Sequence, residues 1–203
     1  MSSEDIERIK QFFNEHIFKW MYEDVRTAIR CKANFLAALG LSEYTGIIGG
    51  LKTGKLLCEN CCRSNYEAFL PYLEQPYVDI NSKLKSKGGL YKIVRCGLAH
   101  KYFIKGPHVI MNDPKRPDDS PLLDTFDCEV LFIGEELGFI VDVYFRDFKK
   151  GIEKYYRELI DEKGLAVFRE CLKAIFERQK IEGPMVWGSS GTILDLDFKD
   201  GTD

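Results

Sequence analysis

The sequence predicts a mainly helical protein, a helical bundle with a small antiparallel β insertion and two further C-terminal helices. Three observations predict this fold class. Apolar residues recur at helical spacing through most of the first hundred residues. Short runs rich in β-branched and aromatic residues follow Gly106 and Pro107. Helical spacing then returns from about Asp147, and the 203-residue chain, 45% hydrophobic and 30% charged, can bury a core.

The first half fits five helices. Residues 3–20 place six apolar side chains at helical spacing behind a Ser-x-x-Asp/Glu start, which is typical of a helix N-terminus. A second helix is predicted from about residue 23 to residue 39, with Gly40 as its stop. Shorter helical patterns bounded by Gly or Pro then occupy 42–57, 66–73 and 90–103.

The second half begins with strand patterns at 109–111, 128–133 and 139–145. Residues 134–138 are a loop of hairpin length, and 113–121 form a polar, proline-rich loop. Two helices follow, at about 147–162 and 165–179. The predicted organisation is a helical bundle over 1–106, a β-hairpin element and C-terminal helices packed on the same domain over 107–182, and a tail over 183–203.

Several classes of location and partner are disfavoured by composition. No stretch approaches the roughly 20 uninterrupted apolar residues that a membrane helix needs. The acidic N-terminus lacks a signal-peptide pattern. Seven cysteines, an odd number scattered along the chain, favour reduced thiols over a disulfide framework. We therefore expect a cytoplasmic protein without membrane association.

Charge is distributed unevenly along the chain, whose net charge is −3. Seven of its 29 basic residues lie between residues 81 and 112, a stretch with no Asp or Glu, so 22 basic residues remain elsewhere against 32 acidic ones. A basic segment of this kind can attract a polyanion that the net charge would repel. The alternative interpretation of these basic residues is a solvated, lysine-rich loop and helix face that binds no partner.

The pair Arg95 and His100 is the strongest candidate site in that basic segment. It joins a permanent cation to a side chain that exchanges protons near neutral pH. Such a pair suits phosphodiester chemistry, because arginine can neutralise charge on phosphorus while histidine transfers a proton. A spacing of five residues separates the two by about 140° on an ideal helix. Either Gly97 loosens the helix, or the long arginine side chain reaches around it, or the two groups belong to different halves of a composite site.

Other motifs are weaker. Residues Gly49 to Lys55 nearly match a phosphate-binding loop, but Leu56 replaces the hydroxyl that would hold magnesium, so a loop between helices is the simpler interpretation and nucleotide binding a remote alternative. Cys58, Cys61 and Cys62 have the spacing of half a zinc site, without a second half in sequence. His16 and His108 have no partner in sequence. We expect no metal and no cofactor.

The arginine, the four intervening residues and the Ala99-His100 ending resemble the motif of the HEPN superfamily, helical modules of toxin, antiviral and RNA-processing systems. The resemblance covers roughly residues 5–105. It implies a homodimer in which two motif helices form one cleft, and a metal-independent endoribonuclease that uses the RNA 2′-hydroxyl as nucleophile. Arg95 would stabilise the phosphorane and His100 would do the acid/base work.

Beside that pair, the side chains expected to guide RNA are Lys92, Lys101, Lys105 and Tyr102. The resemblance also leaves an alternative, a non-catalytic HEPN module for dimerisation or RNA binding in a toxin-antitoxin or defence system, with a cognate antitoxin or regulatory protein as partner. Many active members have a polar residue such as Asn or His directly after the arginine, whereas this chain has Cys96.

Overall fold

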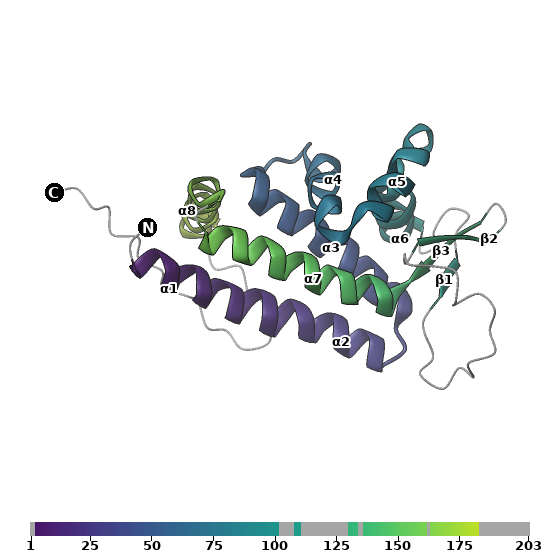
Figure 1. The fold of residues 1–203 in the computed structure, drawn as a ribbon, viewed down its shortest axis with the longest axis horizontal. Coiled ribbons are helices and arrows are strands. Elements are labelled where there is room, and N and C mark those ends of the chain that lie inside the picture. The colour runs from purple at the N-terminus through teal and green to yellow at the C-terminus, as the bar shows by residue number, and fades with distance from the viewer. Residues whose placement is uncertain (1–2, 102–107, 111–129, 134–135, 162, 183–203) are drawn as a thin grey trace.

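The computed structural model describes residues 3–101, 108–110, 130–133, 136–161 and 163–182 (Figure 1). These residues are mainly helical, as the sequence predicts. The predicted loop at 113–121 and the predicted tail at 183–203 lie outside the described residues. No helix in the described ranges combines the length and the apolar character needed to cross a lipid bilayer.

The chain begins with a long helical rod. Three segments follow one another without a break: α1 (Ser3–Phe12), the π-helical η1 (Phe13–Met21) and α2 (Tyr22–Arg30). The rod ends where Lys32 adopts a φ of 57°, and α3 (Asn34–Thr53) follows. The predicted helix stop at Gly40 is therefore wrong. Gly40 lies inside α3, because burial of that helix in the bundle outweighs the low helix propensity of one glycine.

Seven further helical segments complete the described chain: α4 (Cys62–Leu73), α5 (Gln75–Lys83), the 3-10 turn η2 (Lys85–Lys87), the π-helical turn η3 (Tyr91–Arg95), α6 (Cys96–Lys101), α7 (Val141–Ile160) and α8 (Leu165–Glu182). The sequence did not predict α5. Pro76 lies in its first turn, where a proline costs no hydrogen bond. Glu74, with a φ of 115°, separates α5 from α4.

The three strands form one small sheet with the order β1-β3-β2. They are β1 (His108–Ile110), β2 (Val130–Ile133) and β3 (Glu136–Ile140). The pair β2–β3 is antiparallel, but β1 pairs with β3 in parallel, so the sheet is mixed and the prediction of an antiparallel sheet is only partly correct. It lies at the end of the bundle where α7 begins (Figure 1).

The predicted strand at 139–145 is too long, because β3 ends at Ile140 and α7 begins directly at Val141. The apolar run over residues 139–145 fits the periodicity of a strand and also that of a helix. In the structure Val141, Tyr144 and Phe148 are fully buried, at the three- and four-residue spacing of one helix face. Packing of that face against the bundle therefore decides the local structure.

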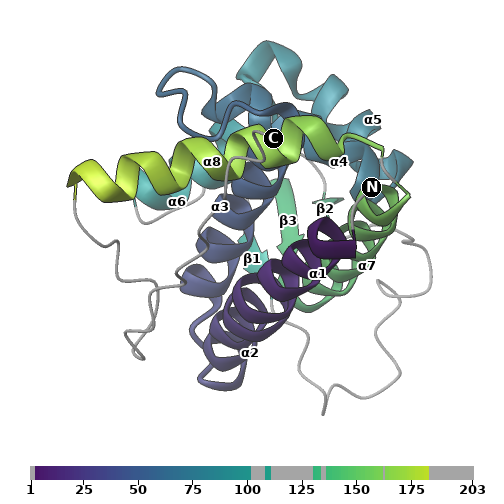
Figure 2. The same ribbon diagram turned by 90° about the vertical axis from the view of Figure 1, so that its left-hand side faces the viewer.

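One apolar core joins all the long helices. Figure 1 shows α7 running beside the α1–α2 rod, where the ring of Phe13 contacts Tyr155 and Tyr156. In Figure 2, α8 crosses one end of α3. One polar cluster inside this core links three helices: the Tyr144 hydroxyl on α7 lies 2.9 Å from the Thr45 hydroxyl on α3 and 3.2 Å from the Tyr66 hydroxyl on α4.

The helices α3 and α4 meet most closely at Gly49. A Cβ atom on Gly49 would lie 1.8 Å from the backbone oxygen of Asn65. Asn65 is 3% exposed, and its side-chain amide donates to the Lys55 carbonyl at 2.9 Å while its oxygen accepts from the Thr53 hydroxyl at 3.0 Å. The absence of a side chain on Gly49 thus lets α4 bind the end of α3 and the loop that follows it.

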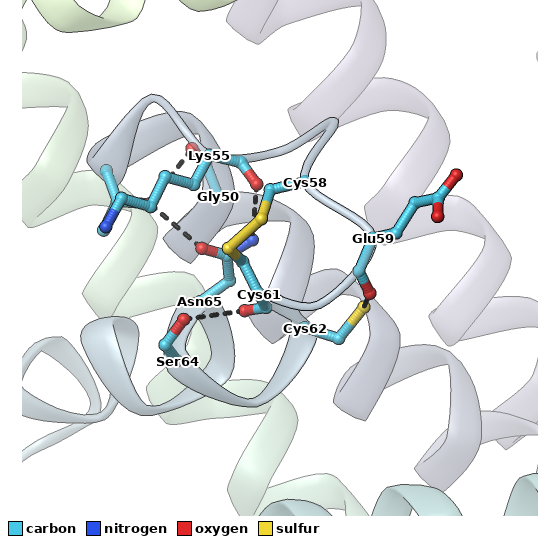
Figure 3. The surroundings of a disulfide bond; sticks show 9 residues. Gly50, Lys55, Cys58, Glu59, Cys61, Cys62, Ser64 and Asn65 are labelled. Carbon is cyan, nitrogen blue, oxygen red and sulfur yellow. Dashed lines mark hydrogen bonds between the residues drawn. A yellow bond between two sulfur atoms is a disulfide. The ribbon is translucent and has the colours of Figure 1, made fainter.

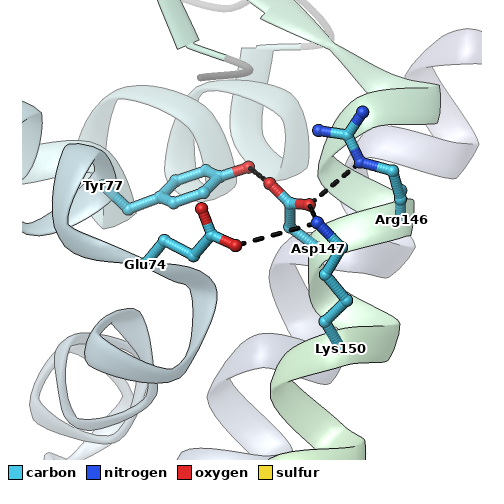
Figure 4. A network of polar contacts seen from close by, with 5 residues as sticks. All are labelled: Glu74, Tyr77, Arg146, Asp147 and Lys150. Atoms are coloured by element: carbon cyan, nitrogen blue, oxygen red, sulfur yellow. Dashed lines mark hydrogen bonds and ion pairs between the residues drawn. The ribbon is translucent and has the colours of Figure 1, made fainter. Parts of the chain in front are cut away.

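A buried carboxylate ties α7 to the junction of α4 and α5 (Figure 4). Asp147 is 1% exposed, and it pairs with Arg146 at 3.0 Å and with Lys150 at 3.1 Å. Lys150 also lies 3.7 Å from the Glu74 carboxylate. The hydrogen bond and the charge of Asp147 raise the pKa of Lys150. The network compensates the burial of Asp147 with two exposed cations.

Replacing Gly49 by alanine should destabilise the protein strongly, because the new methyl group would force α3 and α4 apart. We expect Gly49→Ala to lower the free energy of unfolding by about 3 kcal/mol. Gly46, also inside α3, is the matched control, since nothing lies within 4 Å of a Cβ at that position. Gly46→Ala should raise the free energy of unfolding by up to about 1 kcal/mol. Urea denaturation followed by circular dichroism measures both, and equal effects would contradict the close contact.

Candidate functional site

The segment that carries Arg95 and His100 is helical. The N–H of Cys96 donates to the Tyr91 carbonyl five residues back, so η3 is a π-helical turn, a feature frequent at functional sites. The segment directs four apolar side chains into the core: Leu90, Ile93, Val94 and Leu98. Lys92 and His100 are exposed, while Arg95 is half-buried at the edge of the packed face.

Arg95 contacts α3. Its Nε donates to Oε1 of Glu43 at 2.5 Å, and its guanidinium carbon lies 5.5 Å from the centre of the Tyr91 ring. The side chain of Arg95 is 24% exposed and that of Glu43 is 41% exposed. A guanidinium has five N–H donors, and this hydrogen bond uses one of them. The cation is therefore anchored at one edge and open to solvent in part.

The electrostatics around Arg95 keep it charged. Burial is the largest single effect and lowers the pKa of Arg95, but the hydrogen bond and charge of Glu43, with smaller contributions from Tyr91 and Cys96, together raise the pKa above its ordinary value. Burial also raises the pKa of Tyr91 to about 12, against the opposing effect of the Arg95 charge. The site thus holds a permanent cation, an acidic side chain that accepts its hydrogen bond, and a phenol with a raised pKa.

The structure does not bring His100 to Arg95 within one chain. His100 makes no hydrogen bond or ion pair with any residue that the structure describes, whereas Arg95 turns toward Glu43. This divergence is the result of the five-residue spacing, which places the two side chains on different faces of a helix. A site that uses both groups would have to span these two faces.

The basic segment is free of acidic residues in sequence but not in space. Lys83, Lys85 and Lys87 are exposed, like Lys92. Glu43, however, reaches the segment from α3. The side chain of Lys101 and the whole of Tyr102 and Lys105, all expected to guide RNA, lie outside the described part of the structure.

The near-match to a phosphate-binding loop is a helix end. Gly49 and Gly50 lie within α3, and Gly54 caps it with a φ of 71°, in the left-handed region that favours glycine. The Lys55 N–H donates to the Gly50 carbonyl at 3.0 Å. These backbone groups serve the helix and its cap, so their geometry favours the helix-connecting interpretation over a phosphate cradle.

The expectation that the cysteines are reduced thiols is wrong for two of them. Cys58 and Cys61 form a disulfide in the loop between α3 and α4 (Figure 3). The bond takes up two thiols of the suggested half zinc site. Within the described ranges, no group of three or more His, Cys, Asp or Glu side chains is placed to hold a metal ion. The free thiols there are Cys31, Cys62, Cys96 and Cys171.

His16 lies among aromatic side chains. Its ring centre is 5.1 Å from that of Phe12 and 4.6 Å from that of Trp20. Burial lowers the pKa of His16, against the opposing charge of Glu15. His16 is therefore a packed, neutral side chain at pH 7. His108 begins β1.

Sequence reasoning missed Glu43 and a hollow on another face of α3. Glu43 lies 52 residues before Arg95, and a separation of that size gives no local signal. Its neighbour Tyr44 contacts α2 instead, where its hydroxyl donates to Asp24 at 2.7 Å. Asp24, Tyr44 and the exposed Leu36 line a hollow of about 370 Å³ between α2 and α3. Only helix packing reveals either feature.

Removing the charge of Glu43 should expose Arg95 to external anions. We expect Glu43→Gln to change the free energy of unfolding by less than about 1 kcal/mol, because the ion pair is partly exposed. The variant should elute from immobilised polyphosphate at higher salt than the wild type. Glu23→Gln is the matched control, since Glu23 pairs with Arg26 on α2 and the variant has the same net charge. Equal elution of the two variants would contradict a local effect at Arg95.

Comparison with protein-family models, with curated proteins and with solved structures found no match to this chain. Its function must therefore be argued from its own residues. The geometry that bears on function is the anchored guanidinium of Arg95, the exposed His100 and the lysines of the basic segment.

Proposed function

We propose that this protein is a HEPN-like, homodimeric RNA-binding protein that acts as a metal-independent endoribonuclease on single-stranded RNA. The observation that carries the proposal is the state of Arg95. It is charged at every physiological pH, fixed by Glu43 and still partly open to solvent. Arginine in this state can bind a phosphate in a defined orientation.

RNA is supported as the ligand by the exposed lysines of the basic segment that contains Arg95. Lys83, Lys85, Lys87 and Lys92 are all exposed. Together with Arg95 they provide several charges that can neutralise successive phosphates of a nucleic acid. The phosphates dominate the affinity of such an interface, and the binding should therefore weaken steeply with salt.

Cleavage would proceed by transesterification within RNA. The 2′-hydroxyl loses its proton to a base and attacks the adjacent phosphorus, while the bond from phosphorus to the 5′-oxygen breaks and that oxygen takes up a proton. His100 can accept or donate these protons. Arg95 can stabilise the additional negative charge on the phosphorane oxygens. Water, a metal ion and a cofactor are not needed for these bond changes.

The dimer follows from the divergence of the two side chains. Arg95 is anchored on α3, and His100 points into solvent from the next turn of the same helical segment. Two copies that meet through this segment would place the arginine of one copy near the histidine of the other. The cleft between the two copies would then contain both groups.

The alternative proposal is a scaffold that binds RNA or a regulatory partner such as an antitoxin without turnover. The ion pair with Glu43 supports it, because a carboxylate so near the guanidinium opposes the approach of a phosphate. Cys96 next to Arg95 also departs from the polar residue that is common in active members of the resembled family. Binding without cleavage would distinguish the two proposals.

Purified protein should cleave single-stranded RNA in EDTA and leave 2′,3′-cyclic phosphate ends. Arg95→Ala and His100→Ala should each reduce the rate by about 100-fold or more, since each removes transition-state stabilisation or proton transfer. Gel electrophoresis measures the cleavage rate, and mass analysis identifies the ends. Arg157→Ala on α7 is the control, because Arg157 is a 78% exposed cation outside the basic segment.

RNA that stays intact but binds with a steep salt dependence would favour the scaffold. RNA that neither binds nor is cleaved would contradict both proposals. Cleavage that survives in Arg95→Ala and His100→Ala would identify a contaminating nuclease or another site.

Light scattering should give twice the 23.4 kDa mass of one chain. Mixing inactive Arg95→Ala chains with inactive His100→Ala chains should restore part of the activity, because the shared cleft of a mixed dimer keeps one arginine and one histidine from different chains. A strictly monomeric protein, or a mixture without restored activity, would contradict the composite cleft.

A further inference from the structure

The disulfide between Cys58 and Cys61 lies at the molecular surface, between the end of α3 and the start of α4 (Figure 3). Both cysteines are half-buried, and the residues beside them are exposed: Glu59, Asn60, Cys62, Arg63 and Ser64. Figure 3 shows the Glu59 side chain directed away from the two bonded sulfur atoms. A reagent in solution can therefore approach the bond.

This disulfide is poorly suited to stabilise the fold. It joins residues only three apart, and the stabilisation that a disulfide provides by restricting the unfolded chain grows with the length of the loop it closes. The turn has its own hydrogen bonds, since the Cys61 N–H donates to the Cys58 carbonyl at 3.1 Å and the Cys58 N–H donates to the Lys55 carbonyl at 3.2 Å. Asn65 fixes the same loop through Lys55. The turn can thus keep the cysteines adjacent when the bond is open.

The two sulfur atoms differ in their surroundings. Cys61 is the N-cap residue of the 12-residue helix α4, whereas Cys58 lies three residues earlier in the loop. The positive end of a helix dipole stabilises negative charge on a thiolate. Cys61 is therefore the better leaving group, and Cys58 is the sulfur that an incoming thiolate attacks.

A third cysteine directly follows the pair in sequence. Cys62 is an exposed free thiol, and its Sγ lies 3.6 Å from the Glu59 carbonyl, to which it can donate a hydrogen bond. Three sulfur atoms within five residues allow a mixed disulfide on one cysteine to be released by another. Such a set distinguishes the loop from an inert structural crosslink.

We propose that Cys58, Cys61 and Cys62 form a thiol–disulfide exchange site whose substrate is a small dithiol or the exposed dithiol of another protein. This site is independent of RNA binding. A thiolate of the substrate attacks Cys58 Sγ, the Cys58–Cys61 bond breaks, and the electron pair leaves on Cys61, which takes a proton from solvent. The second substrate thiolate then attacks the mixed disulfide and releases Cys58. The substrate is oxidised to a disulfide, and the protein gains two electrons and two protons.

The experiment follows the wild-type bond in native buffer. Dithiothreitol is added to oxidised protein, the reaction is quenched with acid and the free thiols are alkylated for peptide mass analysis. We expect alkylation of two additional cysteines, Cys58 and Cys61. Dithiothreitol should reduce their disulfide at least about threefold faster than it reduces oxidised glutathione under the same conditions, because Cys61 is a good leaving group. The circular dichroism spectrum should stay unchanged. Oxidised glutathione should then close the bond again.

Variants test the assigned order of attack. The double variant Cys61→Ser/Cys62→Ser should hold one glutathione on Cys58 after treatment with oxidised glutathione. Cys61→Ser alone should lose that glutathione faster, because Cys62 can then attack the mixed disulfide. Cys31→Ser is the matched control, since Cys31 is exposed without a neighbouring disulfide, and it should behave like the wild type.

The proposal is overturned if Cys58 and Cys61 are alkylated before any reductant is added to glutathione-oxidised protein. It is equally overturned if the bond opens only in denaturant, or if its opening unfolds the helices. These measurements use the wild-type protein, so they test the proposal even if a variant fails to fold. RNA cleavage is measured separately, and its loss or survival does not bear on the exchange site.

Discussion

The close contact between Gly49 and the backbone of Asn65 is the constraint on which the rest of the structure depends. It lets α4 lie directly on the end of α3, and the buried amide of Asn65 then fixes the loop between the two helices. The helix α3 in turn carries Glu43 to the basic segment. One missing side chain thus determines the placement of the disulfide loop, and it supports the helix that anchors Arg95.

Helical periodicity predicted most of the helices, because each has an apolar face that the core must cover. Their ends were harder to predict. Gly40 has the form of a helix stop, yet α3 continues through it, since packing stabilises the helix beyond its propensity. The run after Phe139 fits a strand and a helix equally well, and contact with the bundle selects the helix from Val141 onward.

The candidate site was predictable in part. Local sequence marked Arg95 and His100 by residue type and by the absence of nearby acidic residues, and the helical angle already indicated that they diverge. Glu43 was not predictable, because it comes from another helix. The disulfide was missed because the number and spread of the cysteines describe the whole chain. The bond depends instead on one turn that holds Cys58 and Cys61 adjacent.

The ion pair between Glu43 and Arg95 also works as a built-in counterion. A small anion that makes a single contact competes poorly with the Glu43 carboxylate for the Arg95 guanidinium. A polymer that already binds the exposed lysines presents its next phosphate at a high effective concentration, so displacement costs it far less. Under the proposed function, a cation with its own counterion would therefore favour long chains of charge over the small monovalent and divalent anions of a cell.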